Sequence, residues 1–333
     1  MLVKKRLPAL DGLRVLATMG IFLFHSGFLP HGTFPVTLFF MLSGFMMYYT
    51  KYDTITPMTG IHKMKRMYPL HVITFLISIL IWHPWTKLEY SMKYLLEAGV
   101  MHLTLTQAWF PKYTYTYNGL AWYLSVTLFL YAVSYPLVRF VRKVKKTVLW
   151  ILFLWLVILG LDIYLYLYGG VDLYSNPIYR MFDYVLGMML AKQFQEHSFL
   201  EKKRADKTEI GLVILFIIQY ILSFRLGDTP GYYIILFSVV LYILAVGQGC
   251  VSRFLSKHVF YKLANYSFEF YMVHELGLRI FRKVFPEIQM FSRVRYIIRN
   301  GKIAIATLIL SGVFIVLYNN ILKKLKGEVV SCE

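Results

Sequence analysis

The chain has 333 residues, of which 58% are hydrophobic and 16% charged, and its formal net charge is +19. Soluble domains carry about 25% charged residues, so this composition excludes an ordinary soluble protein and predicts a polytopic helical membrane protein. The Lys and Arg residues lie between apolar segments, which indicates cytoplasmic loops and contact with membrane lipids and argues against nucleic-acid binding. Cys250 and Cys332 lack the spacing of a disulfide framework or a zinc site, so no metal site is predicted.

Ten apolar segments near the roughly 20 residues that a bilayer requires predict ten transmembrane helices in one bundle. The first follows Lys4, Lys5 and Arg6, as in a signal peptide, but its apolar run is long and contains Arg14, so we interpret it as an uncleaved span. The amphipathic segment 90–101 is predicted to lie at the membrane interface. The predicted spans are 10–29, 36–50, 68–82, 119–140, 147–168, 177–194, 210–224, 232–250, 263–285 and 302–322.

The distribution of Lys and Arg among the connections predicts that both termini are cytoplasmic. Segments 51–66 and 195–209 are predicted to be charged, solvated loops on that side. The opposite connections are poor in cations, except that seven Lys and Arg residues lie between 279 and 302. Either the span count is wrong there or the outer face carries a basic surface. We find no internal repeat and no separate soluble domain, so residues 1–333 are predicted to form a single transmembrane domain.

The first predicted span carries Asp11, Arg14 and His25, and charges inside a span are costly enough to mark candidate functional residues. Eleven positions bring Arg14 and His25 to nearly the same helix face, about 16 Å apart, and Asp11 shares that face. Arg14 cannot be neutralised and needs an anion, either Asp11 or a ligand phosphate. His25 either hydrogen-bonds across the bundle or takes a proton from a hydroxyl during acyl transfer.

Two further groups of ionisable residues lie inside predicted spans. His274 stands in the ninth span, followed by Glu275 and by Arg279 at ion-pair spacing, four positions after Glu275. Arg180 and Asp183 are three positions apart in the sixth span. For both groups a structural pair and a functional role remain open.

Together these segments resemble the acyltransferase 3 family of membrane acyltransferases. In that family a basic residue precedes LDGLR, and ten further residues separate this motif from a His. Here the basic residue is Arg6, the motif is 10–14 and the histidine is His25. Segment 38–45, LFFMLSGF, is similar to the family's FFxLSGF. The order of the motifs matches over essentially the whole chain. The other similar elements are the basic residues before 68–70, AWYLS at 121–125, Tyr-Pro at 135–136, RMFDYVLG at 180–187 and NYSFEFYMVH at 265–274.

The resemblance implies an all-α integral membrane protein of the plasma membrane with no bound cofactor. It implies transfer of an acyl group, usually acetyl, from cytoplasmic acyl-CoA to a hydroxyl of a cell-surface or lipid-linked polysaccharide. Arg14 would bind a CoA phosphate and His25 would be the general base. Lys63 and Arg66, otherwise ordinary cytoplasmic charges, would assist at the mouth of the third span. The candidate substrate-binding residues are Asp11, Ser43, Tyr48, Lys63, Arg66, Trp122, Arg180, His274 and Glu275.

The chain departs from the family pattern in two respects. Many members have Glu after W-x-L-S-V, whereas Thr127 follows Val126 here, so a Glu-dependent step is not carried over. Some members carry an extra extracytoplasmic hydrolase-like domain, which is not predicted here. The alternative function is a transporter or flippase of a glycan, although the inverted repeats common in transporters are not found. A non-catalytic scaffold would leave Arg14 and His25 unexplained.

Overall fold

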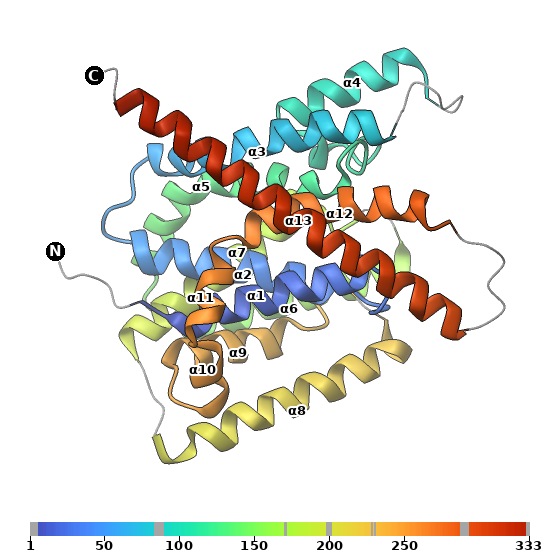
Figure 1. Cartoon of the computed structure of the whole chain (residues 1–333). Coiled ribbons are helices and arrows are strands. Elements are labelled where there is room, and N and C mark those ends of the chain that lie inside the picture. The colour runs from blue at the N-terminus through green and yellow to red at the C-terminus, as the bar shows by residue number, and fades with distance from the viewer. Residues whose placement is uncertain are drawn as a thin grey trace.

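A computed structural model shows an all-helical chain (Figure 1). The structure describes residues 6–82, 90–169, 172–197, 202–227, 229, 231–286 and 293–330, with the side chains of 82, 166, 202–204, 226 and 325–330 left aside. Its α-helices are α1 (Pro8–His25), α2 (Thr33–Lys51), α3 (Met58–Trp82), α4 (Met92–Leu103), α5 (Trp122–Lys143), α6 (Thr147–Tyr168), α7 (Pro177–Glu196), α8 (Lys202–Leu226), α9 (Ile234–Val246), α10 (Cys250–Leu255), α11 (His258–Ala264), α12 (Ser267–Val284) and α13 (Arg293–Val330). Two short 3₁₀ turns, η2 (Gln107–Trp109) and η3 (Gly119–Ala121), precede α5.

Local sequence determines where several helices begin and end. Ser91 and Asn176 cap α4 and α7, since each side-chain oxygen accepts a hydrogen bond from a backbone N–H of the first turn. Pro177 then occupies the first helical position of α7, where no N–H is needed. Gly247 ends α9 in the left-handed conformation, with φ of +67°. This glycine divides the predicted eighth span into α9 and α10.

Each predicted span overlaps at least one helix, α6 has the predicted bounds, and α3, α8 and α13 extend well beyond theirs. Two predicted loops are wrong in part. Segment 51–66 contains the start of α3 at Met58, and segment 195–209 contains the start of α8 at Lys202. Lys, Arg, Met and Glu are good helix formers, so charge alone does not keep such segments out of a helix. The predicted amphipathic segment 90–101 forms most of α4.

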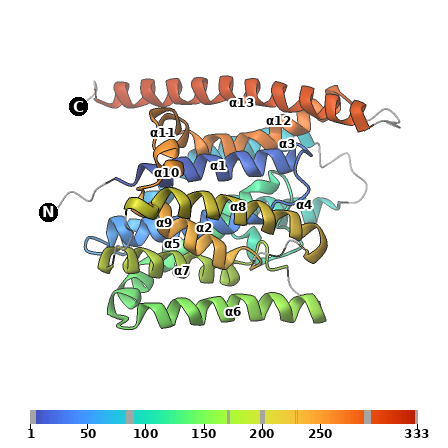
Figure 2. The ribbon, with the colours of Figure 1, turned by 90° about the horizontal axis from the view of Figure 1, so that it is seen from below.

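Five described helical stretches are long and apolar enough to cross a membrane, within α3, α5, α6, α8 and α13. The chain is therefore a multi-pass membrane protein. Four further helices, α1, α2, α7 and α12, have 18 to 20 residues each, but they are not among the helices apolar enough to cross a membrane. The count of ten spans therefore stays a prediction. Figure 2 shows that the start of α1 and the end of α13 lie at the same end of the bundle. This arrangement is consistent with two termini on one side of the membrane.

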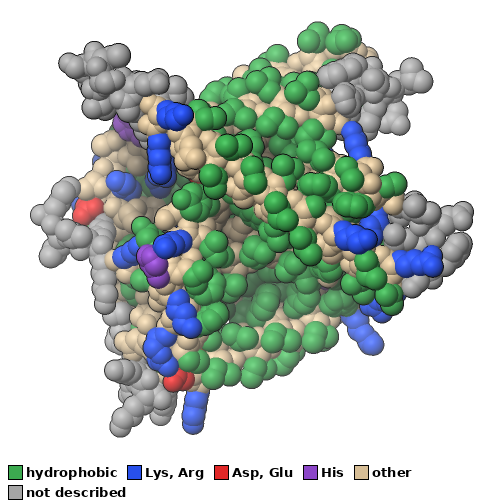
Figure 3. All heavy atoms as spheres, viewed as in Figure 1, with side chains coloured by type: hydrophobic (Ala, Val, Ile, Leu, Met, Phe, Trp, Pro, Cys, Tyr) green, Lys and Arg blue, Asp and Glu red, His purple; other side chains and the backbone are tan. Residues whose placement is uncertain are grey.

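The surface carries a broad apolar band. Large side chains on three outer helices are exposed by 60% or more, among them Leu156 on α6, Ile221 on α8 and Ile309 on α13. Figure 3 shows such side chains across the middle of one face, with Lys and Arg gathered towards both ends. Soluble monomers rarely expose apolar areas of this extent, whereas hydrocarbon tails cover them at no cost.

At the centre of the bundle, α2 and α7 lie in backbone contact. A Cβ atom added at Gly44 would lie 1.9 Å from the carbonyl oxygen of Tyr184, and one added at Gly187 would lie 1.9 Å from that of Met41. Both neighbours are backbone atoms, which cannot move aside without shifting a helix. Small residues allow helices to approach closely in a membrane, and here two glycines serve that purpose reciprocally.

We therefore expect Gly187→Ala to destabilise the protein, by about 1–3 kcal/mol as for other overpacked cores. The measurement is thermal or denaturant unfolding of detergent-purified protein. Gly160→Ala on α6 is the matched control, since no atom lies within 4 Å of the position of its added Cβ. Equal unfolding of the two variants would contradict the proposed backbone contact.

Candidate active site

Two cavities lie along one side of α1, one near each end. The first, which we call the arginine cavity, has a volume of about 220 Å³ and contains Arg14. The second, the histidine cavity, has a volume of about 470 Å³ and contains His25. The arginine cavity is lined by Arg14, Phe39, Leu42, Ser43, Met67, Tyr123, Tyr131, Ala264, Ser267, Phe268 and Tyr271. The histidine cavity is lined by Phe24, His25, Pro30, Gly32, Thr33, Tyr115, Gly119, Leu120, Trp122, Tyr174, Glu275 and Arg279.

Arg14 lines its cavity without a protein counter-ion among the described residues. Asp11, one of its two predicted partners, instead pairs with Arg6, whose Nη2 lies 2.6 Å from the carboxylate. Of the two anions considered for Arg14, Asp11 is therefore not its partner, and a ligand phosphate stays a prediction. Asp11, also predicted to bind substrate, lies outside both cavities. A partly buried guanidinium with no protein anion is suited to an anionic ligand.

A second cation lies close to the arginine cavity. The Lys63 ammonium stands 5.3 Å from the ring centroid of Tyr131, which lines the cavity. Lys63 is near enough to Arg14 and to Lys51 to be repelled by both charges. Gathered like charges are unfavourable without an anion, so this end of the bundle favours an anionic ligand.

His25 forms a hydrogen-bonded pair with His274, which sequence reasoning could not link to it. Nδ1 of His25 lies 3.0 Å from Nε2 of His274, and Nδ1 of His274 lies 3.1 Å from the carbonyl oxygen of Phe270. A carbonyl only accepts, so Nδ1 of His274 carries a proton and the Nε2 of neutral His274 is an acceptor. His25 must then donate from Nδ1. Its Nε2 therefore keeps a lone pair.

The exposures of the two histidines differ. His274 is fully buried and does not line the cavity, whereas His25 does. Glu275 and Arg279 stand in the wall of the same cavity, joined by an ion pair of 3.2 Å. His25 is thus the imidazole that can meet a ligand. Among the described residues, no group of three or more His, Cys, Asp or Glu side chains is arranged to hold a metal ion.

Comparisons with known proteins identify the family of the chain. The acyltransferase 3 family model, described as an acyltransferase domain, matches residues 7–318. The chain belongs to the acyltransferase 3 family. Acyltransferase MdmB from Streptomyces mycarofaciens is 31% identical over 165 residues, which are 44% of this chain and 42% of that protein. The chain thus matches less than half of that relative's length, and no solved structure matches significantly. The predicted family resemblance is confirmed.

Some of the family-like segments contribute residues to the two cavities, and others do not. Ser43, from the segment similar to FFxLSGF, lines the arginine cavity, and Trp122, from AWYLS, lines the histidine cavity. Tyr48 is buried beside Tyr52, with ring centroids 5.7 Å apart, and lines neither cavity. Arg66 is exposed and also lies outside both. A position in a motif therefore does not by itself predict a place in the site.

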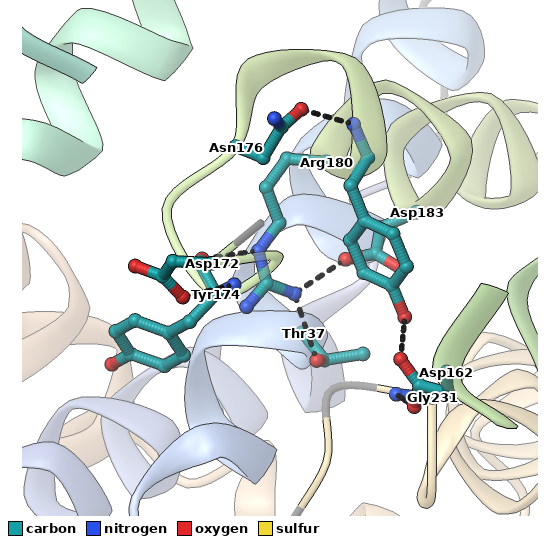
Figure 4. A network of polar contacts seen from close by, with 9 residues as sticks. Thr37, Asp162, Asp172, Tyr174, Asn176, Arg180, Asp183 and Gly231 are labelled. Carbon is teal, nitrogen blue, oxygen red and sulfur yellow. Dashed lines mark hydrogen bonds and ion pairs between the residues drawn. The ribbon is translucent and has the colours of Figure 1, made fainter. Parts of the chain in front are cut away.

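Arg180, from the family-like segment in α7, lines neither cavity and belongs instead to a network of polar contacts (Figure 4). Its Nη1 donates to Asp183 at 2.7 Å and to Thr37 at 3.1 Å, and its Nε donates to the carbonyl oxygen of Tyr174 at 2.8 Å. Arg180 and Asp183 are both fully buried. Arg180 thus joins α7 to α2 and holds the backbone of Tyr174, whose side chain lines the histidine cavity.

About half of the cavity-lining residues that the sequence did not single out are aromatic. Tyr115 stands between the third and fourth predicted spans, 68–82 and 119–140, yet it lines the histidine cavity. Tyr123 and Tyr271 line the arginine cavity. Both lie inside family-like segments, 121–125 and 265–274, and that position is the sequence feature that could have indicated a place in the site. Tyr131, also in this cavity, carries no such signal.

The basic cluster between α12 and α13 is explained in large part by backbone capping. The last carbonyl groups of a helix have no partners inside the helix and attract cations. Four of the seven cations each donate to a backbone carbonyl, most of them at helix ends. The bonds run from Arg279 to Tyr117, from Arg282 to His25, from Lys283 to Ile81 and from Arg299 to Phe285.

We expect Arg180→Ala to act on folding more than on chemistry, because it leaves Asp183 as an unpaired buried charge. Breaking a buried ion pair in this way costs about 3–5 kcal/mol. The measurement is the yield and thermal unfolding of purified protein. Arg253→Ala is the control, since Arg253 forms an exposed ion pair with Asp206. A fully stable Arg180→Ala protein would contradict the structural role.

Proposed function

We propose that the protein is an integral-membrane O-acyltransferase. It moves an acyl group, acetyl in the simplest case, from cytoplasmic acyl-CoA to a hydroxyl of a cell-surface or lipid-linked polysaccharide at the plasma membrane. One observation carries the proposal. One face of α1 presents Arg14 to one cavity and His25, whose Nε2 keeps a lone pair, to another, about 16 Å apart by helix rise.

The arginine cavity is suited to the donor. Coenzyme A carries several phosphates at one end and its thiol at the other, joined by a flexible pantetheine arm. Arg14 and Lys63 supply cations for the phosphates, and a guanidinium is well shaped for them. The arm then extends along α1 and brings the thioester towards His25. With both termini cytoplasmic, the arginine cavity faces the cytoplasm, where acyl-CoA is made.

The histidine cavity is suited to the acceptor. Trp122 and Tyr174 lie with ring centroids 5.0 Å apart in its wall, and aromatic faces of this kind pack against the C–H faces of sugar rings. Glu275 and Arg279 offer hydrogen bonds to hydroxyl groups. A wall that combines apolar faces with a few fixed polar groups supports a carbohydrate acceptor.

The transfer step needs one base. The acceptor hydroxyl oxygen attacks the thioester carbonyl carbon while its proton passes to Nε2 of His25. A carbon–oxygen bond forms and the carbon–sulfur bond breaks. His25 then returns the proton to the sulfur, which leaves as the free thiol of CoA. His274 accepts the Nδ1–H of His25 throughout and so supports the imidazolium that forms between the two proton transfers.

The test is acyl transfer by protein purified in a membrane mimetic, with radiolabelled acetyl-CoA and cell-envelope glycan. His25→Ala should lower transfer by about 100- to 10,000-fold, as expected for loss of a general base, while donor affinity is retained. Arg14→Ala should weaken donor binding. The matched controls are His258→Ala and Arg253→Ala, which change exposed side chains outside both cavities.

Absence of binding to any of several acyl-CoA donors by the native protein would overturn this proposal. Movement of a glycan across the membrane without CoA release would favour the alternative, a transporter or flippase. Transfer that survives in His25→Ala would retain the enzyme but assign the base elsewhere.

His274 is expected to act as a positioning residue, since it touches His25 and not the cavity. His274→Leu removes the acceptor and should lower kcat by about tenfold or more with little change in KM for acyl-CoA. His274→Gln can still accept a hydrogen bond and should recover part of the loss. Equal kcat for the Leu and Gln variants would show that His274 only fills space.

A further inference from the structure

Three aromatic rings form a partition at the inner end of the arginine cavity. Phe39 of α2, Tyr123 of α5 and Tyr271 of α12 all line that cavity. Their ring centroids are 6.1 Å apart for Phe39 and Tyr123, 6.4 Å for Phe39 and Tyr271, and 5.2 Å for Tyr123 and Tyr271. These separations are those of packed aromatic pairs, so the rings close on one another and leave no open channel between them.

The other side of this aromatic partition contacts the wall of the histidine cavity. The ring of Tyr271 lies 6.0 Å from the ring of His274, which hydrogen-bonds His25. The hydroxyl of Tyr271 donates to the carbonyl oxygen of Leu120 at 3.3 Å, and Leu120 lines the histidine cavity. The three rings therefore form an aromatic layer between the two cavities, and Tyr271 lines one cavity and contacts Leu120 in the wall of the other.

A donor held at Arg14 must cross this layer to reach His25, a requirement that rests on the proposed function. The arm of the donor is thin, and rotation of one ring opens a narrow passage for it. The acyl group travels at the tip of the arm and meets the same constriction. Each added methylene that a tight passage must accept costs about 1–3 kcal/mol, or roughly 10- to 200-fold in rate.

We propose that Tyr271, with Phe39 and Tyr123, is the specificity-determining constriction for the acyl group, passing short acyl chains and rejecting longer ones. The same layer keeps water in one cavity from reaching a thioester in the other. Tyr271 is the central member because it contacts both other rings and His274. Its loss should widen the passage more than any other single truncation.

The experiment compares acetyl-CoA, butyryl-CoA and hexanoyl-CoA as donors to one glycan acceptor. Native protein should prefer acetyl, and Tyr271→Ala should raise the hexanoyl-to-acetyl rate ratio by about tenfold or more. It should also raise release of CoA in the absence of acceptor. A ratio of two rates on one preparation does not depend on the fraction of folded protein, so partial misfolding does not obscure the result.

Three variants complete the test. Phe39→Ala removes a second ring and should shift the ratio in the same direction. Tyr271→Phe keeps the ring and should retain the native ratio. Phe281→Ala is the matched control, because Phe281 lies on the same helix as Tyr271 but lines neither cavity.

The outcomes separate the two proposals. No transfer from any donor by native protein would overturn the proposed function itself. Transfer with equal rates for acetyl and hexanoyl in native protein, or with an unchanged ratio in both Tyr271→Ala and Phe39→Ala, would overturn the constriction and leave the enzyme intact.

Discussion

The candidate site depends on one constraint: a charged side chain inside a membrane-embedded bundle needs a partner. Most buried ionisable groups here have protein partners. Arg180 has Asp183, Lys192 donates to the carbonyl oxygen of Val141, and the carboxylate of Glu209 accepts backbone N–H groups at the start of α10. Arg14 differs, since no described side chain neutralises it. The folded chain leaves Arg14 without a protein anion among the described side chains, and that exception, more than the presence of an arginine, is why we propose that an anionic donor binds there.

The usefulness of α1 depends on how firmly its neighbours hold it. Gly12 lies against α10, where an added Cβ would stand 2.4 Å from the carbonyl oxygen of Leu255. At its other end His25 bonds to His274, and the carbonyl of His25 accepts from Arg282. Both ends of the helix are thus fixed by contacts with segments more than 200 residues later. The separation between the backbone positions of Arg14 and His25 is then set by helix rise and does not depend on side-chain motion.

The sequence predicted the positions of the long helices because the hydropathy of a segment and the spacing of its apolar residues are local properties. It predicted Arg14 and His25 as a pair for the same reason, since both stand on one helix. The sequence did not predict contacts between distant residues or between competing partners. His274 is 249 positions from His25, so no local pattern indicates their hydrogen bond. Asp11 could pair with either Arg6 or Arg14, and in the structure it pairs with Arg6. The dense tyrosines fit headgroup contact equally well, so the lining of the cavities was not predictable from composition.

The proposed transfer joins a donor and an acceptor held in two cavities without opening a channel between them. Two cavities separated by a layer of packed rings satisfy both demands, because the layer stays closed except when the reacting groups cross it. In the proposed mechanism the layer also accounts for the buried histidine that holds the base. A carboxylate in that position would bring a further charge to the driest part of the bundle, whereas neutral His274 accepts the hydrogen bond of His25 at no cost in net charge.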